Sequence, residues 1–130
     1  MWRINNKTKE IMVSYGDTFL IPFAITNHVL NANEKLIFTV RKFHMDKRSY
    51  KMILDDIALS KTYTASDAQA ILDHSGNVVG SQICVEASVQ DWESMPIGDY
   101  KYDLVLQNTL LSAQVALIRP TEFIIKEVLL

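Results

Sequence analysis

Three histidines, a single cysteine and two adjacent aspartates are the residues whose types could support catalysis or metal binding. His28, His44 and His74 fall in three separate segments, each of which we expect to be an exposed loop. None has a second His, Cys or carboxylate at a metal-ligand spacing such as H-x-x-x-H or C-x-x-C. The pattern therefore indicates loop histidines and not a convergent catalytic or metal site.

The other reactive residues favour structural roles. Cys84 lies within a segment of strand-like alternation, where we expect a small buried hydrophobic residue, and as the single cysteine it excludes an intrachain disulfide. Asp55 and Asp56 are neighbours in a predicted strand, which directs one carboxylate to each face and excludes a general acid/base pair. We therefore expect a protein that is not an enzyme and uses no cofactor or metal.

One segment concentrates positive charge. Five of the thirteen basic residues lie between positions 41 and 51: Arg41, Lys42, Lys47, Arg48 and Lys51. Phe43 and Tyr50 are interleaved with them, as in surfaces that bind a nucleic-acid backbone. The net charge of −2 argues against nucleic acid. A solvated hairpin end, or a surface that meets an acidic protein partner, explains the same residues.

The bulk properties predict one soluble domain spanning residues 1–130. Hydrophobic residues make up 48% of the chain and charged residues 22%, as in ordinary globular proteins. The first residues lack the apolar stretch of a signal peptide, and no run approaches the roughly 20 apolar residues of a membrane-spanning helix. Secretion and a membrane location are therefore disfavoured, and a reducing compartment during synthesis is expected.

Alternating apolar residues indicate strands along most of the chain. Phe19, Ile21, Phe23 and Ile25 share one parity, and Pro22 among them suggests a sheet edge or a bulge. Residues 36–43, 78–89 and 99–106 follow the same period, with Gly80 as an expected irregularity. About eight such segments, with turns between them and no long amphipathic helix, predict an all-β protein. The expected fold is an immunoglobulin-like antiparallel β-sandwich of about seven to nine strands.

Several segments leave alternatives open. Residues 27–35 are polar and predict a loop, and residues 90–96 a crossover that contains Trp92. Residues 64–72 are compatible with a capped helical turn or a short strand. The end of the chain predicts two strands, 110–118 and 122–129, separated by Arg119-Pro120. We expect the Pro22 strand and residues 122–130 to be sheet edges, with Leu129-Leu130 available for docking.

The most informative local motif is Gly98-Asp99-Tyr100-Lys101-Tyr102. In immunoglobulin-like sandwiches, a Tyr at the start of a late strand donates its hydroxyl to upstream backbone and forms a tyrosine corner. Tyr100, two residues after Gly98, fits that position. Tyr102 falls where antibody domains place a disulfide cysteine, so a large ring is expected to replace the bridge.

Short motifs along the whole chain resemble those of small proteins encoded among the tail genes of phages and prophages of Firmicutes. They are Met1-Trp2-Arg3-Ile4, Met12, residues 16–20, residues 38–42, Asp91-Trp92 leading into residues 95–104, and residues 120–125. Similar domains form the N-terminal part of upper baseplate proteins. Two places depart from the pattern: residues 27–35 replace an acidic, Gly-rich loop, and Asn108-Thr109 replaces a common Asp-Gly turn.

The resemblance implies a structural or assembly module of a phage tail, baseplate or fibre, made in the bacterial host cytoplasm and incorporated into the virion. Its partners would be other tail or baseplate proteins, or further copies of itself. The family fixes no catalytic residues, so none carry over. The alternative is a carbohydrate- or ligand-binding sandwich at a host surface, with Trp92, Tyr50 and Tyr63 as stacking residues if they are exposed.

Overall fold

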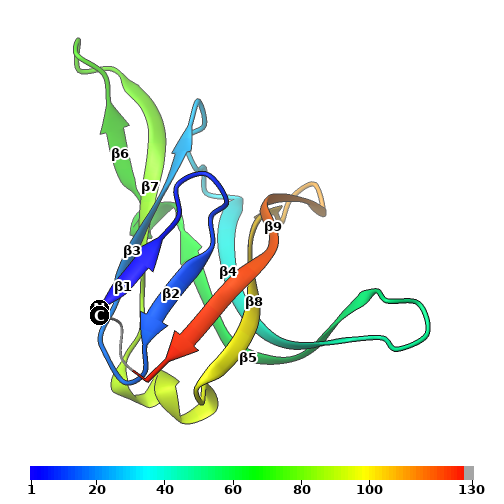
Figure 1. Ribbon diagram of the computed structural model, residues 1–130. Coiled ribbons are helices and arrows are strands. Elements are labelled where there is room, and N and C mark those ends of the chain that lie inside the picture. Colours follow the sequence, from blue (N-terminus) through cyan, green and yellow to red (C-terminus); the bar gives the residue numbers. More distant parts are fainter. Residues whose placement is uncertain (128–130) are drawn as a thin grey trace.

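A computed structural model describes residues 1–127, which form nine strands in two packed sheets (Figure 1). The strands are β1 (Trp2–Ile4), β2 (Ile11–Ser14), β3 (Leu20–Thr26), β4 (Glu34–Met45), β5 (Met52–Thr64), β6 (Gln69–Leu72), β7 (Val78–Glu86), β8 (Gly98–Asn108) and β9 (Ala113–Lys126). The prediction of an all-β sandwich is confirmed.

The larger sheet has the order β1-β2-β9-β8-β4-β5 and the smaller sheet the order β3-β7-β6. In variable-type immunoglobulin domains, strands G, F, C and C′ are neighbours in one sheet and B, E and D in the other. Here β9-β8-β4-β5 and β3-β7-β6 occupy those places. The pairing is antiparallel except between β2 and β9, which run parallel. The parallel pair is a departure from the purely antiparallel prediction.

An aromatic cluster fills the space between the sheets. Phe38 of β4 packs against Tyr102 of β8 and Phe23 of β3, with ring centroids 5.4 and 6.0 Å apart. Phe123 of β9 lies 6.1 Å from both Tyr102 and Phe19. These rings come from both sheets, so burying them holds the sheets together. The alternation of the sequence places them because every second residue of a strand points inward.

Strand β9 is continuous, whereas the sequence predicted two strands separated at Arg119-Pro120. The pairs Tyr102–Thr121 and Leu104–Ile118 leave two residues of β9 opposite the single residue between them on β8, which is a β-bulge. Pro120 lies in this bulge, where a residue without an N–H is tolerated. The chain therefore continues through the proline instead of turning.

The two predicted sheet edges have different outcomes. Strand β3, with Pro22, is an edge of the smaller sheet, as predicted. The prediction for residues 122–130 is wrong over its described part, because Phe123 to Lys126 pair with β2 on one side and Phe123 to Ile125 with β8 on the other. The predicted docking of Leu129-Leu130 lies outside the described residues.

Short 3₁₀ turns connect several strands. Both alternatives for residues 64–72 occur in succession, as η1 (Ala65–Asp67) followed by β6. The predicted crossover is η2 (Val89–Ser94). Each turn begins with a side-chain cap: Asp67 accepts the Thr64 N–H and Asp91 accepts the Ser88 N–H, both at 2.7 Å. Gly80 is required for close packing, since a Cβ there would lie 2.3 Å from the Ile25 carbonyl oxygen.

Candidate interaction surfaces

The tyrosine motif lies where β8 leaves η2. The Tyr100 hydroxyl donates to the Pro96 carbonyl at 2.6 Å, the contact that a tyrosine corner makes, and Gly98 opens the strand. Tyr102 is buried, and its hydroxyl donates to the Lys9 carbonyl. Burial raises the pKa of Tyr102, so its hydroxyl stays protonated. Tyr102 thus ties the β1–β2 hairpin to the core.

Trp92 is a buried corner residue. Only 5% of it is exposed, its Nε1–H donates to the Asp17 carbonyl at 3.1 Å, and its ring lies 6.0 Å from that of Phe19. Tyr63 is half-buried against the core, which leaves Tyr50 as the exposed ring of the three stacking candidates. The burial of Trp92 removes the best support for the carbohydrate-binding alternative.

The reactive residues are placed differently from the predictions in two cases. His28 and His74 lie in loops as expected, but His44 lies within β4 and contacts Asp55 across the hairpin, Nδ1 to Oδ2, at 2.8 Å. Cys84 is exposed, not buried. Its neighbours Ile83 and Val85 point into the core, so the strand period turns Cys84 outward.

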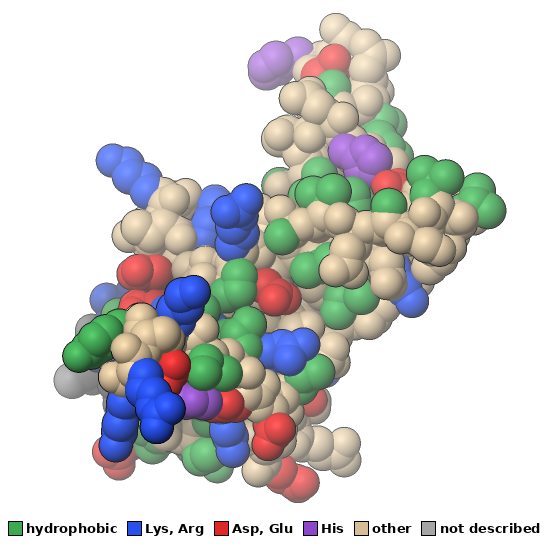
Figure 2. Space-filling view, turned by 90° about the vertical axis from the view of Figure 1, so that its right-hand side faces the viewer, with side chains coloured by type: hydrophobic (Ala, Val, Ile, Leu, Met, Phe, Trp, Pro, Cys, Tyr) green, Lys and Arg blue, Asp and Glu red, His purple; other side chains and the backbone are tan. Residues whose placement is uncertain are grey.

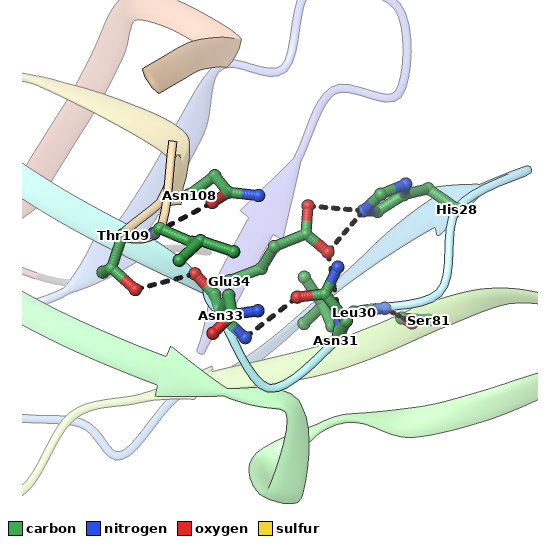
Figure 3. A network of polar contacts seen from close by, with 9 residues as sticks. His28, Leu30, Asn31, Asn33, Glu34, Ser81, Asn108 and Thr109 are labelled. Carbon is green, nitrogen blue, oxygen red and sulfur yellow. Dashed lines mark hydrogen bonds and ion pairs between the residues drawn. The ribbon is translucent and has the colours of Figure 1, made fainter. Parts of the chain in front are cut away.

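His28 belongs to a polar network that holds the loop between β3 and β4 (Figure 3). Its Nε2 lies 2.9 Å from both carboxylate oxygens of Glu34, a buried residue that also accepts the Asn31 N–H at 3.1 Å. The Leu30 N–H donates to Ser81 Oγ at 3.1 Å and so fastens the loop to β7.

The same loop is fastened on its other side. The Thr109 N–H and hydroxyl both donate to the Asn33 carbonyl, at 2.8 and 3.0 Å. In this network His28 and Glu34 form a histidine–carboxylate contact, which the sequence spacing did not suggest. Among the described residues, the Glu34 carboxylate contacts His28 and Asn31, both in the loop that follows β3, so the geometry accounts for loop anchoring. Within residues 1–127 no group of three or more His, Cys, Asp or Glu is placed to hold a metal ion.

The most prominent surface feature is the outer part of the β4–β5 hairpin, residues 41–57, which we call the arm. It extends well away from the body of the sandwich (Figure 1). Arg41 is the last residue of β4 that pairs with β8, and beyond it β4 pairs with β5 alone. Register shifts next to Arg41 place extra residues on β5, and such bulges bend a hairpin.

All five predicted basic residues lie on the arm. Arg41 and Lys42 are in β4, Lys47 and Arg48 in the turn, and Lys51 directly before β5. Figure 2 looks toward the end of the arm, where Lys and Arg side chains gather at the lower left. The described structure thus brings these residues together on one protruding element.

The turn of the arm is organised by Asp46. Its carboxylate accepts the Ser49 hydroxyl at 2.6 Å and the Arg48 N–H at 3.3 Å. These two hydrogen bonds lower the pKa of Asp46. Tyr50, with φ of +57°, completes the turn and leaves 82% of its surface exposed. The turn therefore holds a defined shape while presenting an aromatic ring to solvent.

One face of the arm is apolar, which the sequence reading missed. Met45 pairs with Met52 and Phe43 with Leu54, and both pairs point to the same side because the paired residues are two apart on each strand. Met45 is 53% exposed and Met52 37%. The sequence contains two methionines that flank the turn at matching distances. Their position on one face becomes clear only once the cross-strand pairing is known.

No protein-family model, curated protein or solved structure matches this chain. Over residues 1–127, no helix is long and apolar enough to cross a membrane.

Proposed function

We propose that this protein is a non-enzymatic assembly module that works through protein–protein contacts in the tail, baseplate or fibre of a phage or prophage. The observation that carries the proposal is the arm, which combines an exposed apolar face with five basic residues. The tail setting is supported by the motifs that resemble tail-gene proteins. The partners are other tail or baseplate proteins, or further copies of the chain.

The arm has the physical properties of a docking element. A two-stranded hairpin is at best marginally stable alone in water, and it gains stability when its apolar face is covered. Within residues 1–127 Phe43 receives the Lys101 ammonium 5.1 Å from its ring centre, whereas Met45 and Met52 are 53% and 37% exposed. A partner surface with an apolar hollow and an acidic rim would cover the methionines and meet the basic residues.

The test is the mass in solution, by light scattering after size-exclusion chromatography over a range of concentrations. The wild-type protein is compared with a Met45→Ser, Met52→Ser double variant and with Val89→Ser, a control at another exposed apolar position. We expect a discrete oligomer that the double variant dissociates and the control preserves. A wild-type protein that stays monomeric at every concentration would contradict self-assembly through the arm.

The contribution of charge is tested with the proteins encoded by the genes on either side of this one, purified separately. Complex formation is measured for the wild type and for the arm variants Lys47→Glu and Arg48→Glu. We expect one neighbour to bind and each charge reversal to weaken binding. If the wild type neither oligomerises nor binds any of these proteins, the proposed function is wrong.

A further inference from the structure

A second surface lies on the side of the sandwich where β9 is only partly paired. Strand β2 covers Phe123 to Lys126 of β9, and within residues 1–127 no other strand pairs with β9 on that side. The first half of β9, from Ala113 to Arg119, therefore has backbone groups open to an additional strand. This half carries no charge before Arg119, so it lacks the charged residues with which natural edge strands prevent pairing.

Facing this open half of β9 is β3, the edge of the other sheet. Just before β3 the Phe19 carbonyl accepts the Ala87 N–H, and just after it the Asn27 N–H donates to the Val79 carbonyl of β7. Because bonding alternates along an antiparallel strand, the even-numbered residues of β3 direct their backbone groups away from β7. Pro22 is one of these residues and lacks an N–H. An added strand would therefore form fewer hydrogen bonds with β3 than with the open half of β9.

A groove of about 490 Å³ lies between these two edges. Phe23 and Ile25 of β3 form one wall, and Leu117 and Ile118 of β9 the other. Among the described residues that line the groove, only Lys9 is charged, and it lies at the end where the β1–β2 hairpin closes the sandwich. The Tyr102 hydroxyl holds the Lys9 carbonyl, which fixes the backbone that carries this positive charge.

We infer that the groove accepts an extended segment of a partner protein, which adds to the Ala113–Arg119 half of β9 as a further strand. The segment has apolar side chains at alternate positions, which enter the groove, and a carboxylate at the end beside Lys9. Strand addition of this kind takes affinity from backbone hydrogen bonds and specificity from alternate side chains. This inference rests on the proposed function as an assembly module and assigns that module an acceptor site.

Charge disfavours the arm of a second copy as the occupant. The arm carries five basic and three acidic residues, so it would bring a net positive charge toward Lys9 and Arg119. Like charges placed together disfavour that arrangement. A segment with a carboxylate meets Lys9 favourably, so the occupant is a partner segment that ends in an acidic group.

The experiment uses the full chain and capped synthetic heptapeptides in which valine and threonine alternate. One peptide has glutamate at its first position, one at its last, and a matched pair has lysine instead. Binding is followed by amide chemical shifts in NMR titrations. We expect at least one glutamate peptide to shift the amides of β3 and of residues 113–119, and to bind about fivefold tighter than its lysine counterpart.

Variants locate the site. Leu117→Arg, which places a bulky charge in the groove, should abolish binding, whereas Leu111→Arg, at an exposed position outside the groove, should not. Lys9→Glu should reverse the preference toward the lysine peptide. Absence of binding, shifts confined to other regions, or equal binding by the Leu117→Arg variant would overturn the inference. The groove and the arm share no residue, so such a failure leaves the mass measurements on the arm variants unaffected.

Discussion

Strands β4 and β5 run through two environments, and the comparison separates what folds this protein from what it offers to others. In the body, Leu36, Phe38 and Val40 of β4 are fully buried beneath the smaller sheet. In the arm, the same two strands continue with Met45, Met52 and Ile53, which are 53%, 37% and 42% exposed. The side chains are similar in kind; the difference is that, over the described residues 1–127, no second sheet faces the arm (Figure 1).

The comparison teaches that apolar alternation alone does not identify a core. In the body, alternation is matched by inward-facing residues of the opposite sheet, and packing between them stabilises the fold. In the arm, within residues 1–127, the apolar face meets its cross-strand neighbours and the Lys101 ammonium over Phe43, but no opposite sheet. Stability should therefore depend strongly on the body residues and weakly on those of the arm, whereas association should show the reverse.

The largest effect is expected for Phe38→Ala in the body. Phe38 is fully buried and contacts Phe23, Tyr102 and Phe123, so truncation leaves a cavity among rings from both sheets. The free energy of unfolding should fall by about 3–5 kcal/mol. Urea unfolding followed by tryptophan fluorescence measures this change. A loss below about 1 kcal/mol would show that the core collapses around the cavity. The body would then not be the tightly packed region that distinguishes it from the arm.

A smaller effect is expected for Tyr100→Phe, which removes the hydroxyl that donates to Pro96 and keeps the ring. Unfolding free energy should fall by about 1 kcal/mol, the usual net contribution of one hydrogen bond. Tyr50→Phe is the matched control, since Tyr50 is exposed at the tip of the arm. If both variants lose the same stability in parallel urea titrations, the corner is no more important to the fold than the arm.

The smallest effect on stability is expected for the Met45→Ser, Met52→Ser variant. Both side chains are substantially exposed, so the free energy of unfolding should change by no more than about 0.5 kcal/mol per site. Thermal unfolding of dilute protein, in which association is minimal, measures this. A marked drop in the midpoint temperature would mean that the arm is part of the folding unit, and would remove the distinction between the two regions.

Local patterns were sufficient to predict much of the fold. Residues 99–106 predicted β8, and Gly98, Tyr100 and Tyr102 were placed by a motif only five residues long. The errors arise where a residue's environment is set by distant strands. The continuity of β9 through Pro120 depends on a bulge opposite β8, and the position of Phe123 to Lys126 inside the sheet instead of at its edge depends on pairing with β2.

The candidate surfaces were less predictable. The five basic residues lie close together in the sequence and can be recognised there as a group. The Met45–Met52 pair can be recognised only when the register of the hairpin is known. The groove between β3 and β9 joins segments about ninety residues apart in the sequence, so no local pattern could indicate it. Cys84 was predictable in principle, because the same alternation that buries Ile83 and Val85 turns it outward.

The parallel pair of β2 and β9 has a mechanical consequence. Ile11 begins β2 and Lys126 ends β9, so tension applied between residues 10 and 127 pulls the two strands along their length in opposite directions. The backbone hydrogen bonds between them then resist together, whereas an antiparallel pair pulled from one end opens bond by bond. We predict that single-molecule pulling through residues 10 and 127 requires a higher unfolding force than pulling through Glu34 and Thr64, which lie at the same end of the β4–β5 pair. Equal forces in the two geometries would show that β2 and β9 do not act as a clamp.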